Sequence, residues 1–117
     1  MYTLISKWTI LSGKENDAIE VLKGLALNVK EKEPDTWVYM VHTPDFSETN
    51  LPTPAREEVV FFEIYKDKNA FTAHVSGPVF TDFVNRHGDL FLNNNGKPYV
   101  TLEILINQAG FLRKEHL

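Results

Sequence analysis

The sequence predicts an α+β fold in which a four-stranded antiparallel sheet carries helices on one face. Two kinds of segment alternate along the 117 residues: segments rich in β-branched and aromatic residues, and segments whose apolar residues recur every three or four positions. Their order is strand, helix, strand, strand, helix, strand. With right-handed crossovers, this order gives the ferredoxin-like βαββαβ arrangement.

The first half of the chain is predicted to contain a strand, a helix and a second strand. Residues 4–11 favour an extended conformation because they are rich in strand-forming residues. From residue 14 to about residue 32 the apolar residues recur at helical spacing, with Ser-Gly at residues 12–13 as the expected cap. Pro34 ends this helix, and residues 36–42, Thr-Trp-Val-Tyr-Met-Val-His, are the predicted second strand.

The second half is predicted to contain two more strands around a broken helical region. A loop of residues 43–56 with three prolines precedes a third strand at residues 58–66. Loops of this length are often lids or binding loops. A helical region begins at residue 68 and is interrupted by Ser-Gly-Pro at residues 76–78. After an Asn-rich loop, residues 99–106 are the predicted fourth strand.

Length and composition predict one domain, residues 1–110, followed by a short tail, residues 111–117. The formal net charge is -4 and no dense Lys/Arg cluster is present, so nucleic acid is not an expected partner. The absence of cysteine removes disulfides and thiolate chemistry from consideration. No apolar run is long enough to cross a bilayer, and the first residues do not resemble a signal peptide. We therefore expect no membrane association and a cytoplasmic location.

The predicted strands are apolar on both faces. In the third strand, Phe61 and Tyr65 point to one face while Phe62 and Ile64 point to the other. Two helices can cover only one face, so a twofold partner is the simplest cover for the second, and we expect a homodimer. The alternative is that the tail and the proline-rich loop cover the second face.

Residues 62–74 contain the most informative motif of the sequence. An apolar strand ends in Glu-Ile-Tyr and is followed by a short polar turn, by Ala-Phe and, at position 74, by His. This motif resembles the strand-to-helix signature of the antibiotic biosynthesis monooxygenase family, and the resemblance covers residues 4 to about 106. Members of that family are dimeric ferredoxin-like α+β barrels, which agrees with the two-faced strands.

The resemblance implies several activities. Some members oxidise quinols or polycyclic phenols with molecular oxygen and without flavin, metal or haem. Others isomerise small signalling molecules or degrade haem, and similar barrels serve as stress-response proteins. The haem-degrading branch fits badly, because its Asn, Trp and His positions fall near Lys7, on His74 and on Val84. We therefore expect a monooxygenase that uses no cofactor and oxidises a quinol or another small phenolic aromatic molecule.

Three residues of the motif region are candidate catalytic groups. His74 titrates near neutral pH and is the candidate base, although it could simply bond to backbone beside the helix break. Tyr65 could donate to a substrate oxygen or be a half-buried strand residue. Glu63 shares its face with aromatic residues, which would raise its pKa and suit a base, or it could pair with a lysine across the sheet.

Aromatic residues on the strands and on the second helical region are the candidate walls of a substrate pocket, and core packing is the alternative for each of them. Trp37 and Tyr39 are expected on one face of the second strand, because they are two positions apart. The candidate substrate-binding residues are Trp8, Trp37, Tyr39, Phe80 and Phe83. No metal site is expected, since the histidines have no acidic partner at ligand spacing.

Two other functions stay open at this point. The first is an isomerase of a small carbonyl compound, with His74 and either Glu63 or Tyr65 as an acid/base pair. The second is a non-catalytic binding or stress-response barrel, whose interior would be filled by its own aromatic side chains.

Overall fold

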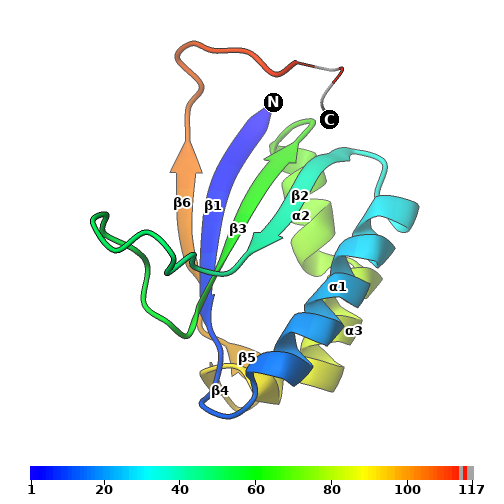
Figure 1. The fold of residues 1–117 in the computed structure, drawn as a ribbon. Helices are drawn as coiled ribbons and strands as arrows, with labels where there is room; N and C mark the ends of the chain where they lie inside the picture. Colours follow the sequence, from blue (N-terminus) through cyan, green and yellow to red (C-terminus); the bar gives the residue numbers. More distant parts are fainter. Residues whose placement is uncertain (114, 116–117) are drawn as a thin grey trace.

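A computed structural model describes residues 1–113 and residue 115, so the expected tail at residues 111–117 lies partly outside the described residues. Its four long strands form one antiparallel sheet in the order β2-β3-β1-β6 (Figure 1). These strands are β1 (Tyr2–Thr9), β2 (Thr36–His42), β3 (Glu58–Tyr65) and β6 (Thr101–Leu105). The predicted fold class, α+β with this four-stranded antiparallel sheet, is confirmed.

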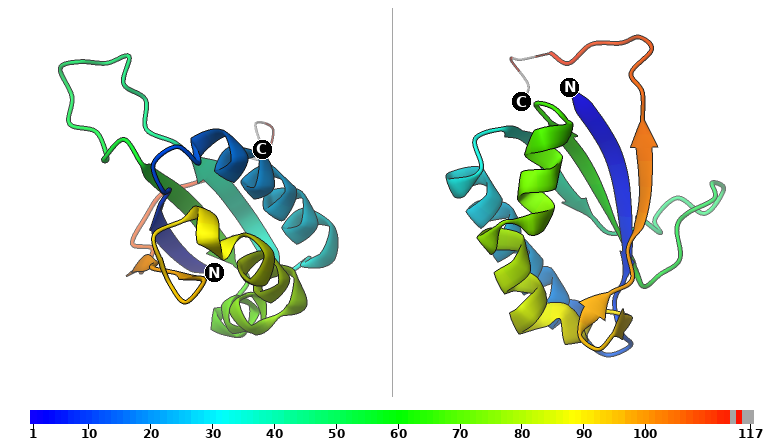
Figure 2. Two further views of the ribbon diagram at one scale, coloured as in Figure 1. Left: turned by 90° about the horizontal axis from the view of Figure 1, so that it is seen from below. Right: turned by 180° about the vertical axis from the view of Figure 1, so that it is seen from behind.

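The helices are α1 (Glu15–Lys32), α2 (Lys68–Ser76) and α3 (Pro78–His87), and all three lie on one face of the sheet (Figure 2). The apolar stripe of α1 is buried as the periodicity predicts. The expected cap at residues 12–13 is wrong, because the N-cap position is Lys14 and its side chain caps nothing. Instead the Glu15 carboxylate accepts a hydrogen bond from the backbone N–H of Gly13 at 3.3 Å. Among the helices that the structure describes, none combines the length and the apolar character needed to cross a membrane.

The break between α2 and α3 has a steric cause. Gly77 is at once the last cap of α2 and the first cap of α3, and Pro78 occupies the first turn of α3. A Cβ atom at Gly77 would lie 2.6 Å from the carbonyl oxygen of Ala73, so a larger residue would force the last turn of α2 to shift. At the other end of α2, the Asp67 side chain accepts from the backbone N–H of Ala70 at 2.9 Å. This break lets both helices turn side chains toward the same sheet.

A small closing element follows α3. It consists of the 3₁₀ turn Gly88–Leu90 and a two-strand hairpin, β4 (Asn93–Asn94) and β5 (Lys97–Pro98). The hairpin sits so close that a Cβ atom on Gly88 would lie 1.8 Å from the carbonyl oxygen of Gly96. The element places Phe91 edge-on against Trp8, with ring centroids 5.0 Å apart.

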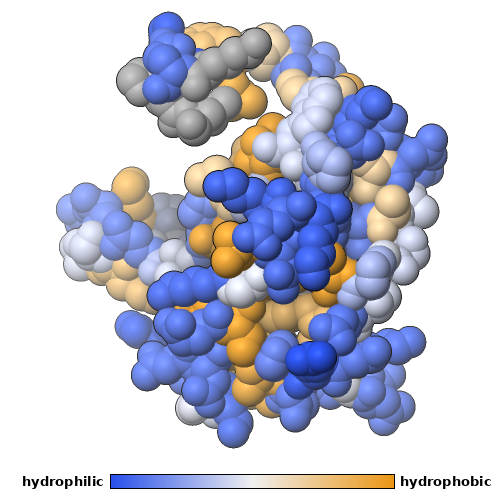
Figure 3. All heavy atoms as spheres, turned by 90° about the vertical axis from the view of Figure 1, so that its right-hand side faces the viewer, coloured by the Kyte–Doolittle hydropathy of each residue, from blue (hydrophilic) through white to orange (hydrophobic). Residues whose placement is uncertain are grey.

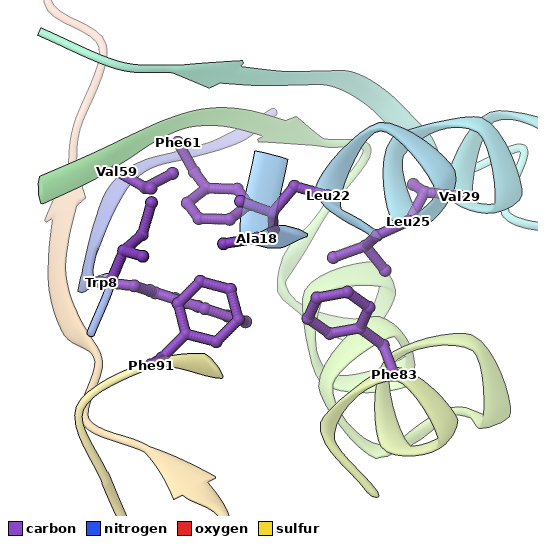
Figure 4. Close-up of a cluster of buried hydrophobic side chains, with 10 residues drawn as sticks. Trp8, Ala18, Leu22, Leu25, Val29, Val59, Phe61, Phe83 and Phe91 are labelled. Carbon is purple, nitrogen blue, oxygen red and sulfur yellow. The ribbon is translucent and has the colours of Figure 1, made fainter. Parts of the chain in front are cut away.

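The main core lies between the sheet and the helices. Trp8 meets Phe61 from β3, Phe83 from α3 and Phe91 in one aromatic cluster, beside leucines of α1 (Figure 4). The exterior over the helices is mostly hydrophilic, with hydrophobic side chains visible only between polar ones (Figure 3).

The opposite face of the sheet carries no helix. Phe62 is partly exposed there and Met40 is half exposed, so the predicted two-faced character of the strands is present. The segment after β6 lies against one end of this face, near Phe62 and Ile64. The loop between β2 and β3, residues 43–57, extends away from the body of the domain (Figures 1 and 2).

Candidate active site

A cavity of about 140 Å³ lies between the sheet and helices α2 and α3. Its lining residues come from six elements or their flanks, and aromatic or apolar side chains predominate. They are Ser6, Trp8, Tyr39, Phe61, Glu63, Phe71, His74, Val75, Phe80, Val100 and Leu102. Because Val75, Val100 and Leu102 are exposed while most of the others are not, the opening lies between α2 and the segment that enters β6.

A carboxylate and a phenol form a buried pair on β3. The Tyr65 hydroxyl donates to Glu63 Oε1 at 2.5 Å, and both side chains point to the helix side because they are two positions apart. Glu63 is only 5% exposed, and its neighbours across the sheet are Leu4 and Tyr39 rather than a lysine. Burial raises the pKa of Glu63 to about 7, against the lowering effect of the Tyr65 hydrogen bond. Near neutral pH this carboxyl group can therefore either take or give a proton.

Tyr65 itself stays protonated. Burial, with the negative charge of Glu63 beside it, raises the pKa of Tyr65 far above its usual value. Its hydroxyl is therefore a permanent donor to Glu63, and this bond fixes the orientation of the carboxyl group.

His74 is held by a residue that the sequence did not indicate. Its Nδ1–H donates to Glu33 Oε1 at 2.7 Å, and Glu33 is the C-cap residue directly after α1. The ring is 3% exposed. Burial lowers the pKa of His74, while Glu33 acts in the opposite direction. With burial dominant, the imidazole is neutral at pH 7, and Nε2 is left as an unprotonated acceptor beside the cavity.

Tyr39 completes the polar lining. Its ring centroid lies 5.2 Å from that of His74 and 5.7 Å from that of Phe61. Burial, followed by the charges of Glu63 and Glu33, raises the pKa of Tyr39, so its hydroxyl remains an O–H donor. Within the described part of the chain, neither this hydroxyl nor His74 Nε2 has a hydrogen-bond partner, so both are available to a ligand.

The structure brings together most of the candidate residues. Trp8, Tyr39, Glu63, His74 and Phe80 line the cavity, and Tyr65 lies directly behind Glu63. The alternative in which His74 only bonds to backbone does not hold, because its partner is a carboxylate.

Two candidate wall residues lie elsewhere. Trp37 is 55% exposed and lies outside the cavity. The pairing of β2 with β3 shifts register between Thr36 and Val38, so Trp37 is the extra residue there and does not share the face of Tyr39. Phe83 is one turn further along α3 than Phe80 and packs into the core against Trp8.

Sequence reasoning missed several cavity residues and their supports. Ser6 is buried and accepts a hydrogen bond from Trp8 Nε1 at 3.1 Å, which fixes the indole at the cavity floor. Ser6 is recognisable in principle, because it shares the strand face of Trp8. The pairing of Glu33 with His74 has no signal, since the two residues are 41 positions apart.

The geometry is that expected of a two-layer α+β domain that binds a small molecule, because an aromatic cavity that contains ionisable groups is typical of small-molecule sites. The family model for antibiotic biosynthesis monooxygenase matches residues 1–86. The chain therefore belongs to the antibiotic biosynthesis monooxygenase family, as the motif at residues 62–74 suggested. Among curated proteins, no sequence matches the chain significantly.

Solved structures share the fold at low sequence identity. A structure described as an antibiotic biosynthesis monooxygenase superposes with a TM-score of 0.70 at 16% identity, covering 93% of this chain and 100% of that chain. Rv0793 from Mycobacterium tuberculosis gives a TM-score of 0.67 at 16% identity, covering 93% of this chain and 98% of that chain. PA3566 from Pseudomonas aeruginosa gives a TM-score of 0.68 at 21% identity, covering 92% of this chain and 94% of that chain. At these identities the likeness establishes the fold.

Proposed function

We propose that this protein is a cofactor-independent monooxygenase that oxidises a single-ring quinol or phenol with molecular oxygen. The observation that carries the proposal is the buried Glu63–Tyr65 pair facing an aromatic cavity that also contains His74. The cavity volume of about 140 Å³ is close to that of engineered apolar cavities that hold one benzene ring. A single ring therefore fits better than the polycyclic phenols that some family members use.

The chemistry begins with removal of a phenolic proton. Glu63, with a pKa of about 7, or His74 Nε2 accepts this proton, and the Tyr39 hydroxyl donates to the resulting oxyanion. The electron-rich anion passes an electron to oxygen, which then bonds to a ring carbon. One oxygen atom stays on the ring and the other leaves as water. A quinol supplies all four electrons and becomes a hydroxyquinone, so no external reductant is needed.

We further propose that the active species is a homodimer in which two copies pair through the helix-free face of the sheet. Met40 and Leu105 are about half exposed on this face, and Phe62 is partly exposed. A stable pair requires each copy to bury roughly 800 Å². Sedimentation at low concentration tests this pairing, and a compact monomer would contradict it.

Oxygen uptake with a panel of monocyclic hydroquinones and catechols tests the activity. We expect protein-dependent uptake that falls by about 100-fold or more in Glu63→Gln, because loss of a positioned base usually costs that much. Glu31→Gln is the matched control, since this exposed glutamate of α1 lies outside the cavity, and it should retain the wild-type rate. Uptake equal to the protein-free background across the whole panel would contradict the proposal.

An isomerase of a small carbonyl compound is the second candidate. It is favoured by the same observation, because Glu63 and His74 offer an acid and a base that need no oxygen. Turnover of hydroxyketones under anaerobic conditions, with the same loss in Glu63→Gln, would identify this reaction instead. The open cavity counts against the third candidate, a barrel filled by its own side chains.

A further inference from the structure

His74 lies between two separate spaces. On one side is the aromatic cavity, and on the other is a surface groove formed by the end of α1, the start of β2 and the α2–α3 break. Glu33 lines the groove, where its side chain is 18% exposed, and reaches His74 from there. The two ring nitrogens of His74 are therefore in different surroundings, because Nδ1 is committed to the groove side.

Glu33 is itself fixed by the turn that follows α1. The Thr36 hydroxyl donates to Glu33 Oε1 at 3.2 Å, and the Thr36 backbone N–H donates to the Glu33 carbonyl oxygen at 3.0 Å. The Glu33 backbone N–H donates to the Val29 carbonyl oxygen at 2.9 Å. The same carboxylate oxygen therefore accepts from both His74 and Thr36, and two backbone hydrogen bonds hold the turn that carries it.

We propose that Glu33 is the positioning residue of the site: it holds His74 in the Nδ1–H tautomer, directs Nε2 to the cavity and stabilises the imidazolium that forms when Nε2 accepts a proton. This inference rests on the proposed function for its catalytic meaning, although the tautomer can be tested without it. The arrangement has the logic of a carboxylate–histidine pair, in which the carboxylate orients the ring and does not itself take the proton.

The other groups around His74 cannot supply this role. The rings of Tyr39 and Tyr65 lie tilted against the imidazole, with centroids 5.2 Å and 5.5 Å away, and both hydroxyls remain protonated and uncharged. Glu63 is engaged by Tyr65. Lys32 and Asp35 line the groove and are exposed, so solvent screens their charges. Glu33 is therefore the carboxylate whose removal should change both the tautomer and the pKa of His74.

The test is a pH titration of the ring nitrogens by ¹⁵N NMR, with the His74 signals assigned by comparison with His74→Gln. In the wild-type protein we expect the Nδ1–H tautomer. In Glu33→Gln we expect the pKa of His74 to fall by about one unit or more, since an adjacent opposite charge has been removed. Glu31→Gln, an exposed glutamate in the same last turn of α1, is the matched control and should leave the pKa unchanged.

A further variant keeps the test decisive. Thr36→Val removes only the hydroxyl that orients Glu33. The pKa of His74 should therefore also fall in this variant, by less than in Glu33→Gln. If Glu33→Gln does not fold, Thr36→Val alone carries the test. In the activity assay, Glu33→Gln should lower kcat by about tenfold or more with little change in KM.

The outcomes separate the two proposals. An unchanged tautomer and pKa in both Glu33→Gln and Thr36→Val would overturn the positioning role, whatever the activity. The expected NMR changes without any oxygenase activity in the wild-type protein would support the positioning role and would contradict the proposed function instead.

Discussion

The layer between the sheet and the helices is solid at one end and hollow at the other. At the solid end, Trp8 packs against Phe83 and Phe91 in a cluster whose buried members are all apolar among the described residues (Figure 4). At the hollow end, the same kind of aromatic wall surrounds Glu63 and His74. Trp8 borders both ends. The difference shows that one continuous apolar layer can supply folding energy at one end and shift the pKa values of catalytic candidates at the other.

Replacing Trp8 should have the largest effect on stability, because its indole is buried in the aromatic cluster at the solid end. We expect Trp8→Ala to lower the free energy of unfolding by about 3–5 kcal/mol, through lost burial and the cavity left behind. Trp37→Ala, which removes an exposed indole, should cost about 0.5 kcal/mol or less. Urea denaturation measures both. Equal costs for the two tryptophans would show that the aromatic cluster does not dominate the core.

The hollow end should make stability depend on pH through Glu63. Its pKa is about 7 in the folded protein against an ordinary 4.5, so between these values the folded state keeps a proton that the unfolded state loses. This contribution therefore decreases stability as pH rises from 4.5 to 7, by about 3 kcal/mol in total.

Glu63→Gln should remove this contribution. Compared with the wild-type protein, the variant should gain about 3 kcal/mol in unfolding free energy between pH 4.5 and pH 8. Glu57→Gln, at an exposed glutamate, should follow the wild-type curve. A constant difference between Glu63→Gln and the wild type at every pH would mean that the carboxyl group is not held in its protonated form.

Ser6→Ala tests the boundary between the two ends. The variant leaves the buried Trp8 Nε1–H without its acceptor, which should cost about 1–3 kcal/mol. Ser76→Ala removes an exposed hydroxyl that bonds to the Thr72 carbonyl oxygen, and it should cost about 0.5 kcal/mol or less. Urea denaturation monitored by tryptophan fluorescence compares the two. A negligible cost for Ser6→Ala would imply that water replaces the hydroxyl from the cavity side.

The smallest predicted effect concerns the start of α2, the helix that carries His74. Asp67→Ala removes the N-cap bond to Ala70 and should cost about 1 kcal/mol, whereas Asp67→Asn should retain most of the stability. Hydrogen exchange of the first-turn amides of α2 measures the effect locally. Unchanged exchange in Asp67→Ala would show that packing against the sheet, and not the cap, holds this end of the helix.

The sequence predicted the elements well where the local signals agreed. The second strand was placed at its observed bounds, because Pro34 and the long loop limit it on both sides. Element ends were less accurate: β1 begins two residues earlier than predicted, at Tyr2, because its pairing with Tyr65 extends it. The fourth strand is shorter than predicted, because its pairing with β1 extends only from Thr101 to Leu105.

The candidate site was predictable only in part. Glu63 and His74 were found because a motif joins them within one short segment. Trp37 was misplaced, because strand alternation holds only while the register is regular and a shift precedes Val38. Glu33 could not be found, because its contact with His74 depends on how α1 ends relative to α2 and leaves no pattern along the chain.

The last strand has a consequence for how the chain can be divided. The family match stops at residue 86, yet β6 lies beyond it and pairs with β1 along Thr3–Lys7. A fragment that ended at residue 86 would expose the backbone amides and carbonyls along that side of β1. Such an exposed edge strand can pair with strands of neighbouring molecules. We therefore expect the fragment to aggregate under conditions in which the longer chain does not.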